Sequence, residues 1–164
     1  KALSGAMTPA SGIVADREIM TTLKVGDHGS TYGGNPLSMA IVKAAVGVLK
    51  DEGMVENSAE VGPYMKRKLE AMTNKSLVRE IRGRGLMNAL EIEKNSSVNG
   101  NDLCDILREN NLLTKATKDY ICRLTPALNI TKQEVDETVA IVDECLGKLE
   151  RLNEERTGSK LYEK

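Results

Sequence analysis

One stretch, HGSTYGGNPL from His28 to Leu37, decides how this chain is organised. It carries two hydroxyl side chains, Ser30 and Thr31, and then two adjacent glycines and an Asn-Pro pair. Asparagine is favoured just before a helix, and proline suits the first helical position because its missing N–H has no intrahelical partner there. The stretch therefore predicts a loop that leads into a capped helix, running from Pro36 to about Glu52.

The chemistry of this loop suits an anion, phosphate above all. The start of the expected helix offers backbone N–H groups and the positive end of the helix dipole, beside the hydroxyls of Ser30 and Thr31. The glycine pair lets the backbone approach a ligand closely. The alternative is an ordinary loop before a capped helix. Spacing alone leaves both open, because short glycine motifs often occur by chance.

Composition excludes several classes of function. The chain has 164 residues, of which 40% are hydrophobic and 29% charged, with a net charge of −1. This balance gives no electrostatic basis for binding nucleic acid or an anionic membrane. No apolar run approaches the roughly 18 residues that a membrane-spanning helix needs. With four Tyr and no Phe or Trp, the core must be built from aliphatic side chains.

Cysteine and histidine offer little for metal or triad chemistry. Cys104, Cys122 and Cys145 are widely separated and match none of the usual metal-ligand spacings. An odd number of scattered thiols fits a reducing compartment better than a disulfide framework. His28 is the only histidine, and we expect it to pack or to bond within a turn. We therefore expect no metal site and no Ser-His-Asp triad.

The patterns along the chain predict a mixture of helices and strands. In order, we expect a short buried strand at 12–15, a short helix at 16–23, the capped helix at 36–52, a helix at 55–72 interrupted at Gly62 and Pro63, two strands within 76–93 joined at RGRG, a helix at 102–110, short strands and turns at 112–130, and a helix from a Thr131-x-x-Glu134 capping box to about Leu152. This interleaving indicates an α/β or α+β fold with a boundary near Gly53. Residue 1 is Lys, so the sequence reads as one entered partway through something longer.

Two motifs of the chain, KALSG at 1–5 and HGSTYGGNPL at 28–37, together resemble those of the class III pyridoxal-phosphate aminotransferases. The segments VREIRGRGLMNALEI at 78–92 and ENNLLTKATKDYICRLTPALNIT at 109–131 support the resemblance, which extends to about Leu149. RLTPALNI, at 123–130, is more similar to the branch that uses ornithine than to the branches that use acetylornithine or 4-aminobutyrate.

The resemblance implies a fold-type I α/β enzyme. Residues 1–52 would be the C-terminal part of the large cofactor domain and 53–152 the small α+β C-terminal domain. Apart from the resemblance, the polar composition of 153–164 predicts a frayed tail. The resemblance implies pyridoxal 5′-phosphate as cofactor and ornithine and 2-oxoglutarate as substrates. It also implies a homodimer, because the Ser-Thr pair of this loop reaches the cofactor phosphate of the neighbouring subunit in this family. The compartment implied is the cytoplasm or the mitochondrial matrix.

The resemblance also assigns roles to four residues. Lys1 matches the catalytic lysine that binds the cofactor aldehyde covalently, Ser30 and Thr31 match the phosphate contacts, and Arg123 matches the arginine near the substrate carboxylate. Lysine suits its role because a neutral amine bonds to an aldehyde and can then move a proton. A planar guanidinium can grip a carboxylate with two hydrogen bonds. Without the resemblance, Lys1 would be read as a solvated surface charge and Arg123 as part of a surface ion pair.

The chain departs from the family pattern near Lys1. Gly5-Ala6 stands where the family usually has a glycine pair, and Thr8-Pro9-Ala10-Ser11-Gly12 replaces an aromatic-Pro-x-Ser-Ala motif. The groups that hold the cofactor ring lie upstream of Lys1 in the family, so this chain alone should not catalyse transamination. Three interpretations remain: the C-terminal part of an aminotransferase that uses ornithine, a non-catalytic structural subunit derived from one, or a class III enzyme with another amino donor.

Overall fold

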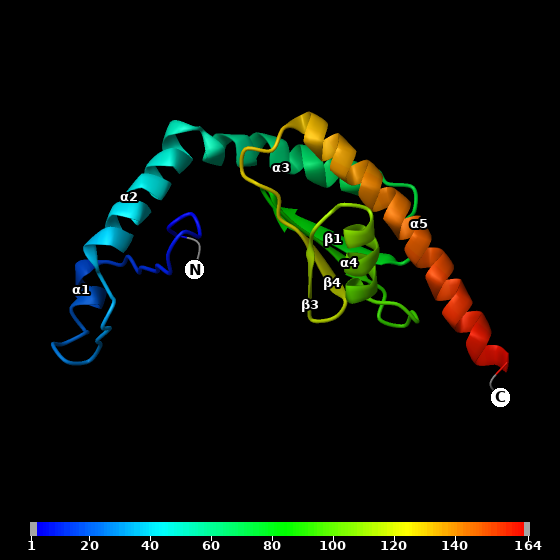
Figure 1. The fold of residues 1–164 in the computed structure, drawn as a ribbon, viewed down its shortest axis with the longest axis horizontal. Helices are drawn as coiled ribbons and strands as arrows, with labels where there is room; N and C mark the ends of the chain where they lie inside the picture. The colour runs from blue at the N-terminus through cyan, green and yellow to red at the C-terminus, as the bar shows by residue number, and fades with distance from the viewer. Residues whose placement is uncertain (1–2, 163–164) are drawn as a thin grey trace. The chain divides into compact units, whose positions relative to one another are not determined.

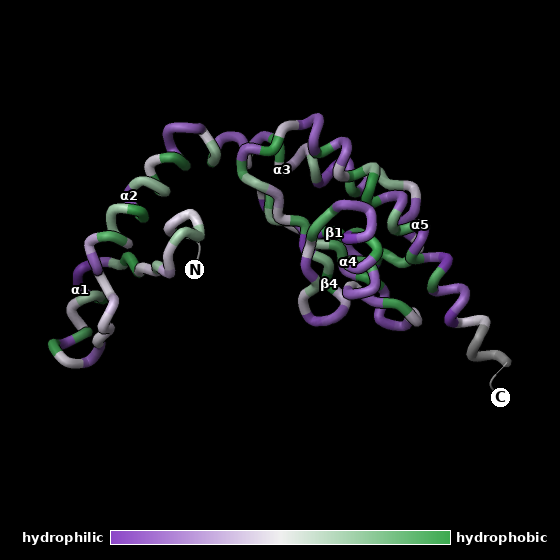
Figure 2. The backbone as a smooth tube through the Cα atoms, in the orientation of Figure 1, coloured by the Kyte–Doolittle hydropathy of each residue, from purple (hydrophilic) through white to green (hydrophobic). Residues whose placement is uncertain are grey.

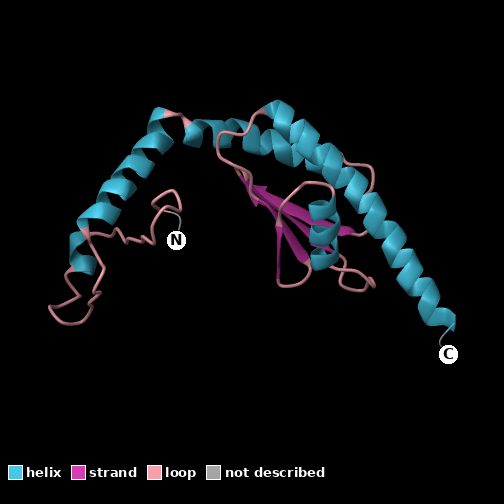
Figure 3. Ribbon diagram, viewed as in Figure 1, coloured by secondary structure: helices cyan, strands magenta, loops and turns pink. Residues whose placement is uncertain are grey.

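The computed structural model describes residues 3–162 and divides the chain into two compact units, Lys1–Gly53 and Met54–Lys164. Figure 1 traces the elements of each unit, and Figure 3 separates helices, strands and loops. The first unit contains the helices α1 (Arg17–Met20) and α2 (Pro36–Asp51). Among the described residues, the second unit contains four strands and three further helices. The division into cofactor domain, small domain and tail stays a prediction about the whole protein.

Helix α2 begins as its sequence predicts. Pro36 is its first residue, and the side chain of Asn35 accepts a hydrogen bond from the backbone N–H of Ser38 at 2.9 Å. The side-chain NH2 group of Asn35 in turn donates to the carbonyl oxygen of Tyr32 at 2.8 Å, which connects the preceding loop to the start of the helix. The helix ends before Gly53, whose φ of +59° suits a residue without a side chain. Asn35 thus fixes the direction in which the loop at 28–34, called the HGST loop below, enters the helix.

The predicted buried strand at 12–15 is wrong. The segment has no regular secondary structure and is exposed, with Ile13 at 73% and Val14 at 101% of their reference surface areas. A strand needs a partner to satisfy its backbone groups, and no strand of residues 3–162 pairs with this segment. The short helix expected at 16–23 is present but covers only Arg17–Met20.

The second unit is built on a four-stranded antiparallel sheet in the order β1-β2-β4-β3. Its strands are β1 (Val78–Arg84), β2 (Met87–Ile92), β3 (Lys115–Thr117) and β4 (Ile121–Leu124). The RGRG segment makes the predicted connection, since β1 and β2 form a hairpin in which Arg84 pairs with Met87. Gly85 in the turn has a φ of +55°, where a side chain would be strained.

Three helices complete the second unit: α3 (Met54–Glu70), α4 (Gly100–Glu109) and α5 (Lys132–Tyr162). Helices α3 and α5 lie side by side, and α4 packs on β3 and β4 (Figure 1). Hydrophobic and hydrophilic bands alternate along α5 in Figure 2, as expected for a helix with one buried face. The core between the helices and one face of the sheet is aliphatic, as predicted; its largest fully buried apolar side chains include Met65, Leu69, Leu90, Ile92, Leu103, Leu107, Leu146 and Leu149.

Helix α3 is continuous where the sequence predicts an interruption. It runs through Gly62 and Pro63 as one element of 17 residues. A Cβ atom placed on Gly62 would lie 2.3 Å from the carbonyl carbon of Gly85, so the glycine lets the helix backbone contact the hairpin turn directly. Gly62 therefore serves close packing and does not mark a helix end.

We expect Gly62→Ala to destabilise the protein by about 1–3 kcal/mol, because the added methyl group has to push the backbone of Gly85 away. Gly158→Ala is the matched control, since Gly158 is also helical and a Cβ there meets nothing within 4 Å. The control should be neutral or stabilising by up to about 1 kcal/mol, because alanine favours a helix more than glycine does. Urea unfolding of both variants measures the difference, and equal effects would contradict the packing role of Gly62.

Helix α5 starts at the predicted capping box and continues past its predicted end. The Thr131 N–H donates to the Glu134 carboxylate at 2.8 Å, and the Glu134 N–H donates to the Thr131 hydroxyl oxygen at 3.2 Å. The helix does not stop near Leu152 but reaches Tyr162. Asn153 accepts from the Ser97 N–H at 2.8 Å, and Arg156 forms an ion pair with Asp102 at 2.9 Å. These partners on the loop before α4 and on α4 itself hold residues that sequence patterns assign to a frayed tail.

Glu91 should give the stability of the protein a measurable dependence on pH. It lies on β2, and its carboxylate binds Arg82 at 2.7 Å and Arg79 at 3.1 Å. The hydrogen bond from Arg82, followed by the charges of its basic neighbours, holds the pKa of Glu91 below the ordinary value of 4.5. The stabilisation is therefore present above pH 4.5 and is lost as the pH falls through the lower, folded-state pKa. Thermal unfolding between pH 6 and about pH 3 should show a flatter acid decline for Glu91→Gln than for the unaltered protein, and parallel curves would contradict the assignment.

Within residues 3–162, no helix combines the length and the apolar character that crossing a bilayer requires.

Candidate functional site

The HGST loop forms one wall of a pocket in the first unit. The pocket measures about 560 Å³ and is lined by residues 8–11, by Ser30 and residues 32–35, and by Ser38 and Met39 at the start of α2. The loop, the segment near the N-terminus and the first turn of a helix thus meet around one cavity. This is the arrangement that the sequence predicts for an anion at a helix N-terminus.

Two glycines shape the loop around Ser30. The Gly33 N–H donates to the carbonyl oxygen of Ser30 at 3.3 Å, closing a turn. A Cβ atom at Gly33 would lie 2.9 Å from the Ser30 Cβ and 3.0 Å from its hydroxyl oxygen, so any side chain there would displace Ser30. Gly34 has a φ of +70°, which places it in the left-handed region. The glycine pair therefore allows the Ser30 hydroxyl to lie at the pocket beside the start of α2.

The residues of this pocket fit a phosphate group. Ser30 supplies a hydroxyl donor, and the first turn of α2 supplies the favourable end of a helix dipole. Thr8 lines the same pocket, and its hydroxyl oxygen is buried without a hydrogen-bond partner in the described part of the chain. A buried hydroxyl of this kind is stabilised when a ligand accepts its hydrogen bond. Thr31 is exposed on the same loop and is not part of the pocket wall.

The predicted catalytic lysine cannot be located in this fold. Lys1 lies outside the residues that the structure describes, so its assignment stays a prediction. In the described range 3–162, no group of three or more His, Cys, Asp or Glu side chains is arranged to hold a metal ion.

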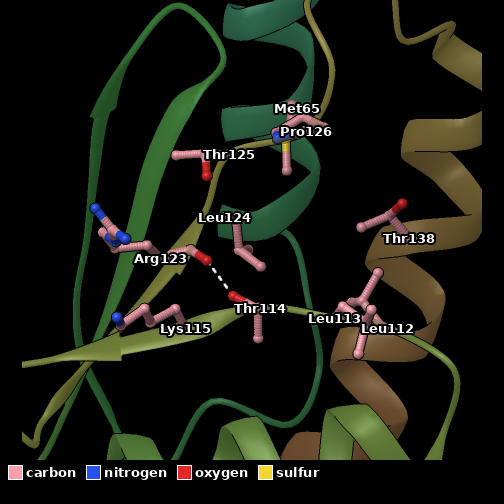
Figure 4. A pocket seen from close by; sticks show the side chains of 10 residues that line it. All are labelled: Met65, Leu112, Leu113, Thr114, Lys115, Arg123, Leu124, Thr125, Pro126 and Thr138. Carbon is pink, nitrogen blue, oxygen red and sulfur yellow. Dashed lines mark hydrogen bonds between the residues drawn. The ribbon is translucent and has the colours of Figure 1, made fainter. Parts of the chain in front are cut away.

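Arg123 lies in the second unit, on β4, and lines a separate pocket of about 280 Å³. The walls of this pocket are apolar on one side and carry three threonine hydroxyls, as Figure 4 shows; the remaining lining residues are Met65, Leu112, Leu113, Thr114, Lys115, Leu124, Thr125, Pro126 and Thr138. The Thr114 hydroxyl donates to the carbonyl oxygen of Arg123 (Figure 4). Because Thr114 directly precedes β3, this hydrogen bond connects the start of β3 to β4. The backbone that carries Arg123 is thereby held on both edges, by β2 and by β3.

Lys115 is a second cation in this pocket, and the sequence patterns did not single it out. Lys115 and Arg123 are directly paired across the β3–β4 ladder, so their side chains share a face of the sheet. Figure 4 shows both extending to the same side. Like charges in this arrangement repel each other, and an anion between them relieves the repulsion. The missed signal is the hairpin itself, whose short strands at 115–117 and 121–124 set Lys115 opposite Arg123.

The predicted site residues thus fall into two groups. Ser30 and Thr31 share one loop of the first unit, and Arg123 joins Lys115 in the second. Each group has the character of part of a site: donors for a phosphate in one case, and cations for a carboxylate in the other.

Comparison with known proteins identifies a family. The model of the family described as aminotransferase class III matches residues 1–146. An ornithine aminotransferase of Plasmodium falciparum (isolate CDC / Honduras) is 46% identical over 143 residues, which are 87% of this chain and 34% of that protein. The mitochondrial ornithine aminotransferase of Rattus norvegicus is 40% identical over 146 residues, which are 89% of this chain and 33% of that protein. The chain therefore spans about a third of the length of these relatives.

Solved structures give the same result. The ornithine aminotransferase of Plasmodium yoelii superimposes with a TM-score of 0.82 at 40% identity, covering 89% of this chain and 39% of that one. The acetylornithine aminotransferase of Elizabethkingia anophelis gives 0.81 at 39% identity, covering 90% and 39%. An ornithine aminotransferase of Toxoplasma gondii, with partial occupancy of pyridoxal phosphate at its active site, gives 0.81 at 33% identity, covering 93% and 36%. These likenesses confirm the predicted fold-type I class, and this chain belongs to the class III aminotransferases.

Proposed function

We propose that this chain supplies part of the active site of a pyridoxal-phosphate-dependent ornithine aminotransferase. The reaction is transfer of the δ-amino group of ornithine to 2-oxoglutarate, which yields glutamate semialdehyde and glutamate. The observation that carries the proposal is the 46% identity to an ornithine aminotransferase over 87% of this chain. The two partial sites support it, because one suits a phosphate and the other a carboxylate.

In this proposal the residues of the first unit bind the cofactor. Ser30, at the pocket beside the first turn of α2, and the exposed Thr31 on the same loop donate hydroxyl hydrogen bonds to the phosphate of the cofactor that the neighbouring subunit holds. Lys1 would hold the cofactor through its aldehyde, with loss of water, and its amine, once freed, would accept a proton from the substrate carbon that bears the amino group. Bound pyridoxal phosphate supplies an electron sink for the charge left on that carbon.

The residues of the second unit hold the substrates. Arg123 grips a substrate carboxylate with its planar guanidinium, and Lys115 adds a second positive charge on the same face. Two neighbouring cations suit 2-oxoglutarate in particular, because it carries two carboxylates. The apolar wall of the pocket, which includes Leu112 and Leu124, suits the methylene groups between the charged ends of either substrate.

We further propose that the active enzyme is a homodimer and that this chain alone is inactive. Ser30 and Thr31 are exposed in this chain, as expected for residues that reach a neighbouring subunit. Large apolar side chains of the first unit are exposed too, among them Met7 at 77% of its reference area. Such a surface calls for a protein neighbour. The compartment proposed is the cytoplasm or the mitochondrial matrix, and the rat relative is named mitochondrial.

Two alternatives have specific support. The acetylornithine aminotransferase that superimposes at 39% identity favours a class III enzyme with another amino donor. The exposed apolar side chains near the N-terminus favour a structural subunit that is buried in a larger assembly. The first alternative changes the substrate and the second removes the reaction, so one assay distinguishes all three.

The assay uses the natural-length protein, meaning the whole protein of which this chain is proposed to be a part. It follows product formation with 2-oxoglutarate and each of three donors: ornithine, acetylornithine and 4-aminobutyrate. The proposal predicts that ornithine is preferred by a factor of about 100 in kcat/KM, because a donor pocket that fits one amine rejects analogues with altered polar groups. A preference for acetylornithine or 4-aminobutyrate would change the donor. No turnover with any donor, in protein saturated with pyridoxal phosphate, would leave the structural subunit.

A further inference from the structure

Two of the three cysteines are neighbours in the fold, although the sequence separates them. The sulfur atoms of Cys104, on α4, and Cys122, on β4, lie 3.8 Å apart. Helix α4 packs directly on this strand (Figure 1). A disulfide bond joins sulfurs about 2.05 Å apart, so each sulfur has to move by only about 1 Å. The fold thus brings together two thiols that are far apart in the sequence, while Cys145 lies fully buried on α5.

The two thiols differ in exposure and acidity in the way that a reactive pair requires. Cys104 is partly exposed, whereas Cys122 is fully buried. The hydrogen bond between the two sulfur atoms lowers the pKa of Cys104. The same interaction, together with burial, raises the pKa of Cys122 and keeps it protonated. Cys104 is thus the thiol that an external reagent can reach, and Cys122 is positioned to react with Cys104 alone.

We propose that Cys104 and Cys122 form a redox modification site at which a low-molecular-weight disulfide of the glutathione type closes an intramolecular disulfide bond. The Cys104 thiolate attacks one sulfur of the reagent, forming a mixed disulfide and releasing one thiolate. Cys122 then loses its proton, attacks the Cys104 sulfur and displaces the second thiolate. Two protein thiols are oxidised by two electrons, and the reagent is reduced to two thiols. A dithiol reverses both steps.

The proposed redox site is next to the pocket that Arg123 and Lys115 line. Cys122 precedes Arg123 on β4, and its side chain faces the core while that of Arg123 faces away. The Thr114 hydroxyl lies 3.7 Å from the Cys122 sulfur and donates to the carbonyl oxygen of Arg123. Closing the disulfide draws Cys122 toward α4 and changes the contact between the Cys122 sulfur and the Thr114 hydroxyl. The oxidised protein should therefore show a several-fold higher KM for 2-oxoglutarate, an expectation that rests on the proposed function and is absent if that function fails.

Peptide mapping tests the site without any measure of activity. The natural-length protein is incubated with glutathione disulfide, alkylated with iodoacetamide and digested with trypsin. The proposal predicts that peptides 95–108 and 119–123 are recovered linked, with the loss of two hydrogen atoms, and are separated again by dithiothreitol. Recovery of Cys104 and Cys122 as alkylated thiols, or of a link from either to Cys145, would overturn it.

Single serine variants identify the role of each thiol. Cys122→Ser should stop at glutathione on Cys104, because the second step lacks its nucleophile. Cys104→Ser should leave Cys122 unmodified in the folded protein, because Cys122 is fully buried. Cys145→Ser is the matched control and should form the 104–122 link as the unaltered protein does. Glutathione that stays on Cys104 when Cys122 is present would show that the pair does not close.

Discussion

Replacing Lys1 with alanine is expected to lower the rate of transamination by about a thousandfold or more. The lysine is asked to do two things, to hold the cofactor covalently and to move the proton of the substrate carbon, and proton transfer by a positioned side chain is worth about 10²–10⁴ in rate. Without this amine, the proton has to pass to water or to a less favourably placed group. The measurement is kcat for glutamate semialdehyde formation by the natural-length variant.

Two controls separate this role from a general effect of losing a positive charge. Lys24→Ala removes an exposed lysine of the same unit and should leave kcat within about twofold, as surface substitutions usually do. A small primary amine added to the Lys1→Ala variant should restore part of the rate, because it replaces the missing proton carrier. Retention of more than a tenth of the activity by Lys1→Ala would contradict the assignment.

Replacing Arg123 with glutamine is expected to raise KM for 2-oxoglutarate by about 10–100-fold and to change kcat much less. Hydrogen bonds to charged groups contribute about 1.5–3 kcal/mol, and a glutamine keeps neither the charge nor the fork of donors. The KM of Arg123→Lys should lie between those of the unaltered protein and Arg123→Gln, because lysine keeps the charge without the bidentate geometry. Steady-state kinetics with each substrate varied in turn measures these values.

Arg108→Gln is the matched control for this prediction. Arg108 is an exposed arginine of the same unit whose partner is Asp105, 3.2 Å away on the same helix. An exposed pair of this kind contributes little, so KM should stay unchanged. An unchanged KM for Arg123→Gln would mean that the arginine contacts no substrate. Equal losses in both variants would point to an effect on folding.

Local signals in the sequence predict much of the second unit. The capping box at Thr131 and the RGRG hairpin depend on neighbours within a few residues, and both occur as expected. The predictions that failed depend on distant contacts. Gly62 reads as a helix interruption until the approach of Gly85 is known, and the end of α5 is set by Ser97 and Asp102.

The candidate sites show the same distinction. Asn35, Pro36 and the glycine pair act locally, so the form of the HGST loop follows from its own residues. Lys115 and the Cys104–Cys122 pair depend on how strands and helices meet, and a single sequence without that pairing gives no reason to select them. The segment at 12–15 is apolar in sequence but has no partner among residues 3–162, which is why a buried strand was the wrong inference.

Borohydride reduction followed by mass spectrometry tests the central claim most directly. Reduction makes a bond between a lysine amine and the cofactor aldehyde permanent. For the natural-length protein purified with its cofactor, the account predicts one added phosphopyridoxyl group, located at Lys1 by peptide sequencing and absent from Lys1→Ala. Reduced protein without the group, or with it on another lysine, would contradict the assignment of this chain to the cofactor site of an aminotransferase.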